Sequence, residues 1–112
     1  LVLREVAQLI KSHCRDCDLV ARYGGEEMVI IMPSTTMPYA EEVAERIRGV
    51  VEDHRVMHEG HELTVTISLG LSMLGEKVVD KGELIRLADK ALYVSKENGR
   101  NQVTVADAAK SA

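Results

Sequence analysis

The hydrophobic residues of this chain recur with two different periods, and the first of them predicts three helices. Apolar residues three or four positions apart, the spacing of one buried helical face, occur in residues 1–14, 38–53 and 84–97. Pro38 suits the first turn of the second helix, and Asn98 followed by glycine is a good stop for the third. The first helix has no capping residue before it and no initiator Met, so we expect the chain to be part of something longer.

The second period, in which apolar and polar residues alternate, predicts strands. The clearest alternation covers residues 63–73, which we expect to form one long strand, kinked at Gly70. An unbroken apolar run at residues 28–32 is typical of a strand covered on both faces. Shorter strands are predicted at residues 20–23 and 103–105. Helices that alternate with strands predict an α/β fold of two or three layers.

Two glycines, Gly24 and Gly25, separate the first two predicted strands and predict a hairpin, because glycine accepts the positive φ of tight turns. Two adjacent carboxylates, Glu26 and Glu27, follow the turn. Glutamate is a poor strand former, and neighbouring like charges repel unless a positive charge lies near. One interpretation is a place where the backbone approaches a metal-bound phosphate. The other is a surface hairpin that happens to carry two Glu, and the spacing alone leaves both open.

Composition and charge narrow the class of protein. A chain of 112 residues is one domain at most, and its 46% hydrophobic residues are sufficient for a packed core. With no Phe or Trp, that core must be built from aliphatic residues and Met. The net charge of −4 argues against binding to a nucleic acid polymer. No apolar run approaches the length of a membrane span and no signal peptide is visible, so we expect no membrane contact from this segment and a cytoplasmic location.

Cys14 and Cys17 form a Cys-x-x-Cys pair. Redox pairs of this kind open a helix, where the positive end of the helix dipole lowers the thiol pKa. Here the pair falls where a helix is ending, and the histidines of the chain have no recognisable zinc spacing. We therefore expect two ordinary, half-buried thiols.

The segment Arg-Tyr-Gly-Gly-Glu-Glu-Met at residues 22–28 is similar to the signature of GGDEF domains, the diguanylate cyclases, which condense two GTP molecules into cyclic di-GMP. The resemblance runs from residue 1 to about residue 105. It implies the C-terminal part of a nucleotidyl-cyclase-type domain, a central mixed β-sheet flanked by helices, at residues 1–105, with a tail at 106–112. Further segments that fit the family in order are those at residues 18–22, 44–48, 66–70, 88–93 and 96–101.

The resemblance also implies roles for particular residues at the active site. Glu26 occupies the family's metal-binding and catalytic position, where it would hold Mg²⁺ or Mn²⁺, and Glu27 matches the second signature carboxylate. Gly24 and Gly25 would let the backbone close on the nucleotide. Met28 departs from the usual aromatic residue, which we interpret as a change in packing. Substrate-binding residues of the last helix and its exit loop would be Lys96 and Arg100, holding the triphosphate; alone, they would be ordinary solvated charges at a helix end.

A second site follows from the RxxD pattern of the family's inhibitory site. Arg15 and Asp18 match it at the expected distance before the signature, and Arg46 matches the arginine that completes it. In the resemblance these residues bind cyclic di-GMP and inhibit the enzyme. Without it, Arg15 and Asp18 would be a weak surface ion pair.

The family's N-terminal portion has no counterpart in this chain. It would supply a first strand with a further metal-binding Asp, and the residues that bind phosphate and read guanine. We therefore expect the parent protein to be a Mg²⁺-dependent cyclase that acts as a homodimer, while this fragment alone is inactive and could exchange segments between chains. The alternatives are a non-catalytic cyclic di-GMP receptor, which would lose its ligand when Arg15 is mutated, and an interaction module, which would lose nothing.

Overall fold

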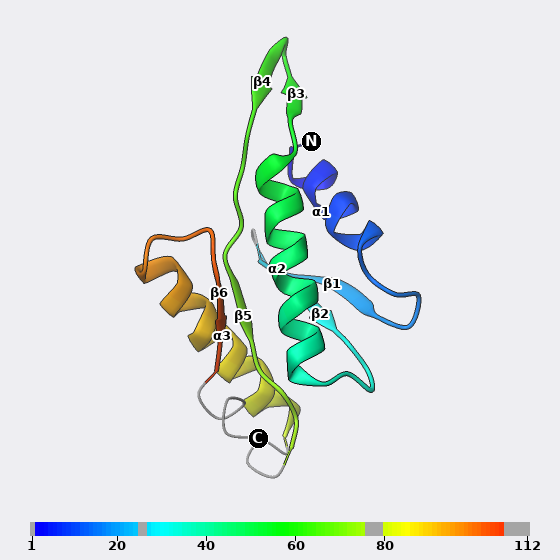
Figure 1. Cartoon of the computed structure of the whole chain (residues 1–112), viewed down its shortest axis with the longest axis vertical. Coiled ribbons are helices and arrows are strands. Elements are labelled where there is room, and N and C mark those ends of the chain that lie inside the picture. Colours follow the sequence, from blue (N-terminus) through cyan, green and yellow to red (C-terminus); the bar gives the residue numbers. More distant parts are fainter. Residues whose placement is uncertain (1, 25–26, 76–79, 107–112) are drawn as a thin grey trace.

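A computed structural model of the chain describes residues 2–24, 27–75 and 80–106 (Figure 1). Helices and strands alternate along the chain, which confirms the mixed α/β class predicted from the hydrophobic periods. The elements in order are α1 (Val2–Ser12), β1 (Leu19–Gly24), β2 (Glu27–Ile31), α2 (Met37–Asp53), β3 (Val56–His58), β4 (His61–Leu63), β5 (Leu69–Leu71), α3 (Lys81–Glu97) and β6 (Val103–Val105).

The described strands form three separate pairs rather than one continuous sheet. Strands β1 and β2 are antiparallel, as the glycine turn predicted, and so are β3 and β4. Strands β5 and β6 are parallel, with Leu69 opposite Val103. The β3–β4 hairpin projects from one end of the molecule, while the other two pairs flank α2 (Figure 1).

The prediction of one long strand over residues 63–73 is wrong in extent. Strand β4 ends at Leu63, β5 begins at Leu69, and residues 64–68 pair with no strand in the described part of the chain. The alternation itself is real, because Val65 and Ile67 pack against the core while Thr64 and Thr66 are exposed. The alternation therefore predicted correctly which residues of this extended segment face the core and which face solvent. It could not predict a strand, because a strand also needs a neighbouring strand to complete its hydrogen-bond ladder.

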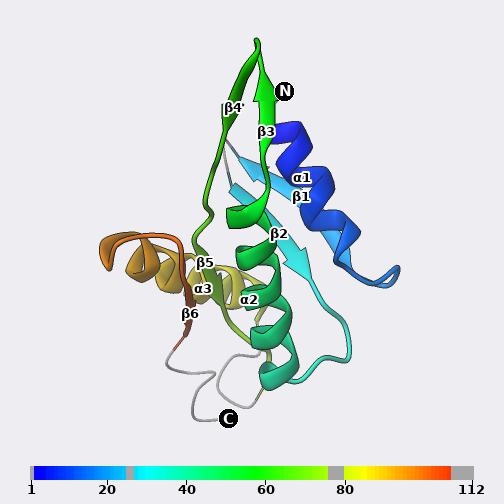
Figure 2. The ribbon, with the colours of Figure 1, turned by 45° about the horizontal axis from the view of Figure 1, so that its top comes forward.

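The core lies between α1 and α2, which run side by side (Figures 1 and 2). It is aliphatic, as the composition required. Apolar residues of β2 and of the extended segment before β5 pack against it. Its buried members are Val6 and Ile10 of α1 and Val43, Ile47 and Val51 of α2.

Helix α3 packs very closely on β5, and Gly70 is the reason it can. A Cβ atom built on Gly70 would lie 2.2 Å from the carbonyl oxygen of Ala88 and 2.2 Å from the amide nitrogen of Leu92. We had expected Gly70 to kink a long strand; its role is instead to let a helix backbone touch a strand backbone. Ser95, which has no exposed surface, then ties α3 to β5 by donating to the carbonyl oxygen of Leu69 (2.8 Å).

The helix ends follow the local signals in the sequence. Asp80 is the N-cap of α3, and its side chain accepts a hydrogen bond from the amide of Gly82 (2.7 Å). Asn98 is the C-cap, and Gly99 follows with φ +108°, which confirms the predicted stop. Ala106, which follows β6, is buried, and its amide donates to the carbonyl oxygen of Leu71 (2.8 Å). Within the described residues, no helix is both long and apolar enough to cross a membrane.

Candidate functional site

The glycine turn at the end of β1 is where the sequence places Glu26 and Glu27, the carboxylates predicted to be catalytic. Gly24 is the last residue of β1 and lies opposite Glu27, the first residue of β2, and the register shifts between Arg22 and Gly24. Such an irregularity beside a turn is a common way to redirect a strand end next to a functional site. Gly25 and Glu26 lie outside the described residues. The predicted hairpin is thus confirmed, while the roles of Gly24, Gly25, Glu26 and Glu27 stay predictions.

Glu26, the carboxylate that the sequence predicts as a metal ligand, belongs to that turn. No group of three or more His, Cys, Asp or Glu that could hold a metal occurs among the described residues. The turn offers carboxylates, the hard oxygen donors that Mg²⁺ prefers. One or two of them are enough, because Mg²⁺ usually completes its shell with water and substrate phosphates. The donor set of the turn therefore fits this ion.

Lys96 and Arg100, the predicted phosphate ligands, both lie at the C-terminal end of α3 and are exposed. Lys96 is in the last helical turn, and Arg100 is in the loop to β6 with φ +65°. Its amide donates to the carbonyl oxygen of Ser95 (2.9 Å), which wraps the loop back over the helix end. Neither cation forms an ion pair with another residue of the described segments. The two side chains are therefore available to an anionic ligand.

Arg15 and Asp18 are brought together in the turn after α1, as the RxxD pattern predicted. The carboxylate of Asp18 accepts from the amide of Arg15 (2.7 Å) and from its guanidinium (Nη2 to Oδ1, 2.9 Å). The Arg15 hydrogen bonds hold the pKa of Asp18 below its ordinary value, although burial opposes them. The Asp18 side chain has no exposed surface, whereas that of Arg15 is 36% exposed.

Three contacts of Arg15 are not predicted by the sequence. Its guanidinium lies over the ring of Tyr39, 5.5 Å from the centroid, in cation–π geometry. The same Nη2 also donates to the carbonyl oxygen of Pro33 (3.1 Å) and to the hydroxyl of Thr35. Tyr39 is 39% exposed and lies well after Asp18 in the sequence, so neither its exposure nor its contact with Arg15 could be read from the motif. Together these contacts hold a planar cation beside an exposed ring.

Arg46, the third predicted residue of this site, reaches the same turn from α2. Its Nη2 donates to the carbonyl oxygen of His13 (3.4 Å). The two free cysteines also lie here; Cys14 is half-buried as expected, but Cys17 is exposed. Burial raises the pKa of Cys14 and the charge of Asp18 adds to this, while Arg46 opposes them. A raised pKa disfavours the reactive thiolate, as an ordinary structural thiol requires.

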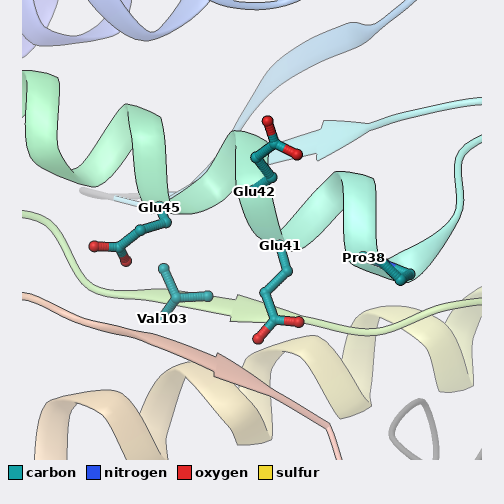
Figure 3. Close-up of a pocket in the computed structure, with 5 residues that line it drawn as sticks. All are labelled: Pro38, Glu41, Glu42, Glu45 and Val103. Carbon is teal, nitrogen blue, oxygen red and sulfur yellow. The ribbon is translucent and has the colours of Figure 1, made fainter.

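Two cavities open around α2, and neither is a ready phosphate site. The first, of about 440 Å³, lies between α2 and β6 and is lined by Pro38, Glu41, Glu42, Glu45 and Val103 (Figure 3). Its carboxylates would repel a nucleotide. The second, of about 580 Å³, is mostly apolar and lies between β2, α2, β5 and α3. Strands β2 and β5 each have only one partner strand in the described part of the chain, so this cavity separates two sheet edges.

Comparisons with known proteins agree with the motifs. The family model described as "Diguanylate cyclase, GGDEF domain" matches residues 1–102. Diguanylate cyclase A of Treponema denticola is 47% identical over 105 residues, which are 94% of this chain and 28% of that protein. The chain thus spans about a quarter of the length of this and similar curated relatives.

Solved structures show the same fold. The GGDEF domain of DgcB from Caulobacter crescentus, in complex with c-di-GMP, superposes with a TM-score of 0.86 at 31% identity and covers 93% of this chain and 62% of that one. The active GGEEF domain of a diguanylate cyclase from Vibrio cholerae superposes with a TM-score of 0.82 at 31% identity, covering 94% of this chain and 66% of that one. The predicted nucleotidyl-cyclase-type fold is confirmed, and the chain belongs to the GGDEF family of diguanylate cyclase domains.

Proposed function

We propose that this chain is the C-terminal part of a catalytic domain whose parent protein condenses two GTP molecules into cyclic di-GMP and releases pyrophosphate. The observation that carries this proposal is the Gly-Gly-Glu-Glu turn between β1 and β2 in a chain of the GGDEF family. The Vibrio cholerae relative is described as an active GGEEF domain, so a Glu in the third signature position is compatible with activity there. A domain that only bound nucleotide would have no need for the second carboxylate.

In the proposed reaction, the 3′-hydroxyl of one GTP attacks the α-phosphate of the other, the bond to the β-phosphate breaks, and pyrophosphate leaves. Glu26 takes up the proton of the attacking hydroxyl, directly or through water. A bound Mg²⁺ supplies charge stabilisation for the attacking and leaving oxygens. Lys96 and Arg100 hold the triphosphate through charge-assisted hydrogen bonds. The same step, repeated with the roles of the two GTP molecules reversed across a two-fold dimer, closes the ring.

We assign product inhibition to Arg15, Asp18 and Arg46. The support is geometric: a partly exposed guanidinium lies between the Tyr39 ring and the buried Asp18 carboxylate, and Arg46 approaches the same turn. A planar cation beside an aromatic ring matches a guanine base, which stacks on rings and on guanidinium planes. The DgcB structure contains c-di-GMP, the ligand that this site would bind.

The isolated chain should lack activity. The solved GGDEF domains are about half as long again as the part that this chain matches. We expect an additional strand to occupy the apolar cavity between β2 and β5 and to complete the sheet. Until it is filled, the two halves of the nucleotide site are not held by one continuous sheet. The open edges of β2 and β5 also invite pairing with another copy, so exchange of segments between chains would provide one route to a dimer.

The test is synthesis of cyclic di-GMP from GTP and Mg²⁺ by the complete protein, with the Glu26→Gln variant as the key comparison. Loss of the carboxylate should lower turnover by about 100-fold or more. Glu42→Gln, which removes an exposed carboxylate on α2, is the matched control and should retain full turnover. Equal activity of both variants would show that the signature carboxylate is not catalytic.

A second candidate function is a cyclic di-GMP receptor without catalysis. It is favoured by the Arg15–Asp18 pair, which is formed independently of the glycine turn. In that case the complete protein would bind cyclic di-GMP, would lose it on Arg15→Ala, and would make none from GTP.

A further inference from the structure

The loop that carries Arg100 has an unusual backbone. Gly99, Arg100 and Asn101 have consecutive positive φ values of +108°, +65° and +49°. Glycine adopts this region freely, but a residue with a side chain does so at a cost and only where its surroundings hold it. Two such residues in succession therefore require contacts that fix the loop from outside.

Asn101 provides those contacts. Its side-chain oxygen accepts a hydrogen bond from Nη1 of Arg48 (2.9 Å), and its side-chain nitrogen donates to Oε2 of Glu52 (2.5 Å). Its amide nitrogen donates to the hydroxyl of Ser68 (3.1 Å). The residue is therefore held by α2 through its side chain and by the segment before β5 through its backbone.

Arg48 is itself fixed in place on α2. Its guanidinium donates to Glu45 through Nε (2.9 Å) and to Glu52 through Nη1 (3.4 Å), and its side chain is only 18% exposed. These hydrogen bonds raise the pKa of Arg48, and the bond with Glu45 has the largest effect, while burial opposes them. Arg48 therefore remains a cation, and its hydrogen bonds with Glu45 and Glu52 fix the direction of the nitrogen that reaches Asn101.

In Arg100 the backbone forms hydrogen bonds with the rest of the protein, whereas the side chain does not. Its amide donates to Ser95 (2.9 Å) and its carbonyl oxygen accepts from Nε2 of Gln102 (3.1 Å). Its side chain is exposed and forms no hydrogen bond with another residue in the described ranges. The backbone of Arg100 is thus fixed on both sides while its guanidinium remains available for a ligand.

We propose that Arg48, Glu52 and Asn101 are positioning residues that hold the exit loop of α3 in the conformation from which Arg100 binds the triphosphate of GTP. This inference rests on the proposed function, in which Arg100 is a phosphate ligand. The three residues touch no substrate atom. They act by keeping the backbone at residues 100 and 101 in its left-handed conformation, so that the guanidinium is aimed before substrate arrives.

The first experiment measures GTP kinetics of the complete protein with Asn101→Ala and Arg48→Ala. We call Arg48, Glu52 and Asn101 the clamp. If the clamp aims Arg100, its loss should raise the KM for GTP by about tenfold and change kcat by less than about twofold. The reason is that a phosphate contact made equally in the ground state and in the transition state acts on binding. Arg86→Ala is the matched control, since it breaks an exposed ion pair with Glu83 at the other end of the same helix. It should leave KM unchanged; an unchanged KM in the clamp variants as well would overturn the proposal.

A double-mutant cycle with Arg100→Ala separates positioning from general support of the fold. If Asn101 acts through Arg100, then adding Asn101→Ala to Arg100→Ala should raise KM no further. If the two effects multiply, Asn101 acts independently and the inference is wrong. The cycle also tests the proposed function separately. If Arg100→Ala alone leaves KM unchanged, Arg100 is not a phosphate ligand, and it is the proposed role of Arg100 that fails.

A milder variant covers the case in which Asn101→Ala does not fold. Asn101→Gly also removes the clamp, but glycine adopts positive φ without strain. Its KM should lie between those of the wild type and of Arg48→Ala, with a wild-type thermal midpoint. A KM for Asn101→Gly equal to that of the wild type would show that the side-chain contacts of Asn101 do not aim Arg100 and would overturn the proposal. A KM above that of Arg48→Ala would contradict the role assigned to the left-handed backbone.

Discussion

Three nitrogens of Arg15 donate to the carboxylate of Asp18: its amide nitrogen (2.7 Å), Nη2 of its guanidinium (2.9 Å) and Nε (3.2 Å). Because the Asp18 side chain has no exposed surface and that of Arg15 is 36% exposed, a ligand that reaches this turn meets Arg15 first. In this arrangement Asp18 orients Arg15, and Arg15 presents its planar cation beside Tyr39. Inhibition by product should therefore depend more on the arginine than on the carboxylate.

The first prediction concerns cyclic di-GMP binding at this turn. Arg15→Lys keeps the charge but cannot reproduce the planar fork that contacts Asp18 and lies over Tyr39, so it should weaken binding by about tenfold or more, nearly as much as Arg15→Ala. Calorimetric titration of the complete protein with cyclic di-GMP measures the effect. Arg86→Lys, a change of the same kind at an exposed pair on α3, should leave the affinity unchanged. Wild-type affinity in Arg15→Lys would show that charge alone is recognised.

The second prediction concerns pH. Since Arg15 holds the pKa of Asp18 below its ordinary value of 3.8, the folded state favours the ionised carboxylate. Its stabilising effect is complete above the unfolded pKa and is lost as pH falls through the lower folded pKa. The wild type should thus be more stable than Asp18→Asn by roughly 1 kcal/mol at neutral pH, and the difference should shrink below about pH 4.

Urea unfolding of the complete domain at a series of pH values gives this difference directly. Other carboxylates, including Glu45 and Glu83, whose pKa values are also lowered by arginine hydrogen bonds, titrate equally in both variants and cancel in the comparison. A gap that grew as the pH fell would contradict the assigned role of Arg15.

The sequence predicted those parts of the fold that local signals determine, and it failed where a structure depends on a distant segment. The three helices and the glycine turn were predictable because caps, turn glycines and helical periodicity are local properties. The extent of the strand at residues 63–73 was not, because its ladder depends on a neighbour that the chain's own alternation cannot reveal. Gly70 shows the same limit: a glycine in a strand pattern indicates either a bend or a close approach, and only the position of α3 decides between them.

The candidate site divides in a similar way. The RxxD pattern placed Arg15 and Asp18 together because residues three apart in a tight turn are neighbours in space. The contacts of Arg48 with Asn101 connect residues 53 positions apart and could not be read from either motif. Asn101 stood within a recognised segment, but its function depends on side chains from α2 and on backbone dihedral angles that sequence patterns do not specify.

The third prediction concerns the contact between β5 and α3. Gly70→Ala would place a methyl group 2.2 Å from backbone atoms of Ala88 and Leu92, which cannot rotate away. The helix must shift, so the free energy of unfolding should fall by about 3 kcal/mol or more. Gly49→Ala is the matched control: Gly49 lies within α2 with nothing within 4 Å of the added atom, and alanine should stabilise that helix by roughly 0.5–1 kcal/mol. Opposite signs are expected in urea unfolding of the complete domain, and a loss of stability in both variants would show that the Gly70 contact is not special.

The last prediction concerns Ser95, which is fully buried and joins α3 to both strands of the parallel pair. Its hydroxyl contacts the carbonyl oxygen of Leu69 (2.8 Å) and the hydroxyl of Thr104 (2.6 Å). Ser95→Ala leaves both half-buried partners short of a hydrogen bond, so it should cost about 1–2 kcal/mol of unfolding free energy. Adding Thr104→Val should cost less than the sum of the single changes, because it removes one of the orphaned groups. Ser12→Ala, which removes an exposed hydroxyl bonded to Leu9, should cost under about 0.5 kcal/mol. Full additivity of the Ser95 and Thr104 changes in urea unfolding would mean that the two hydroxyls do not act as a pair.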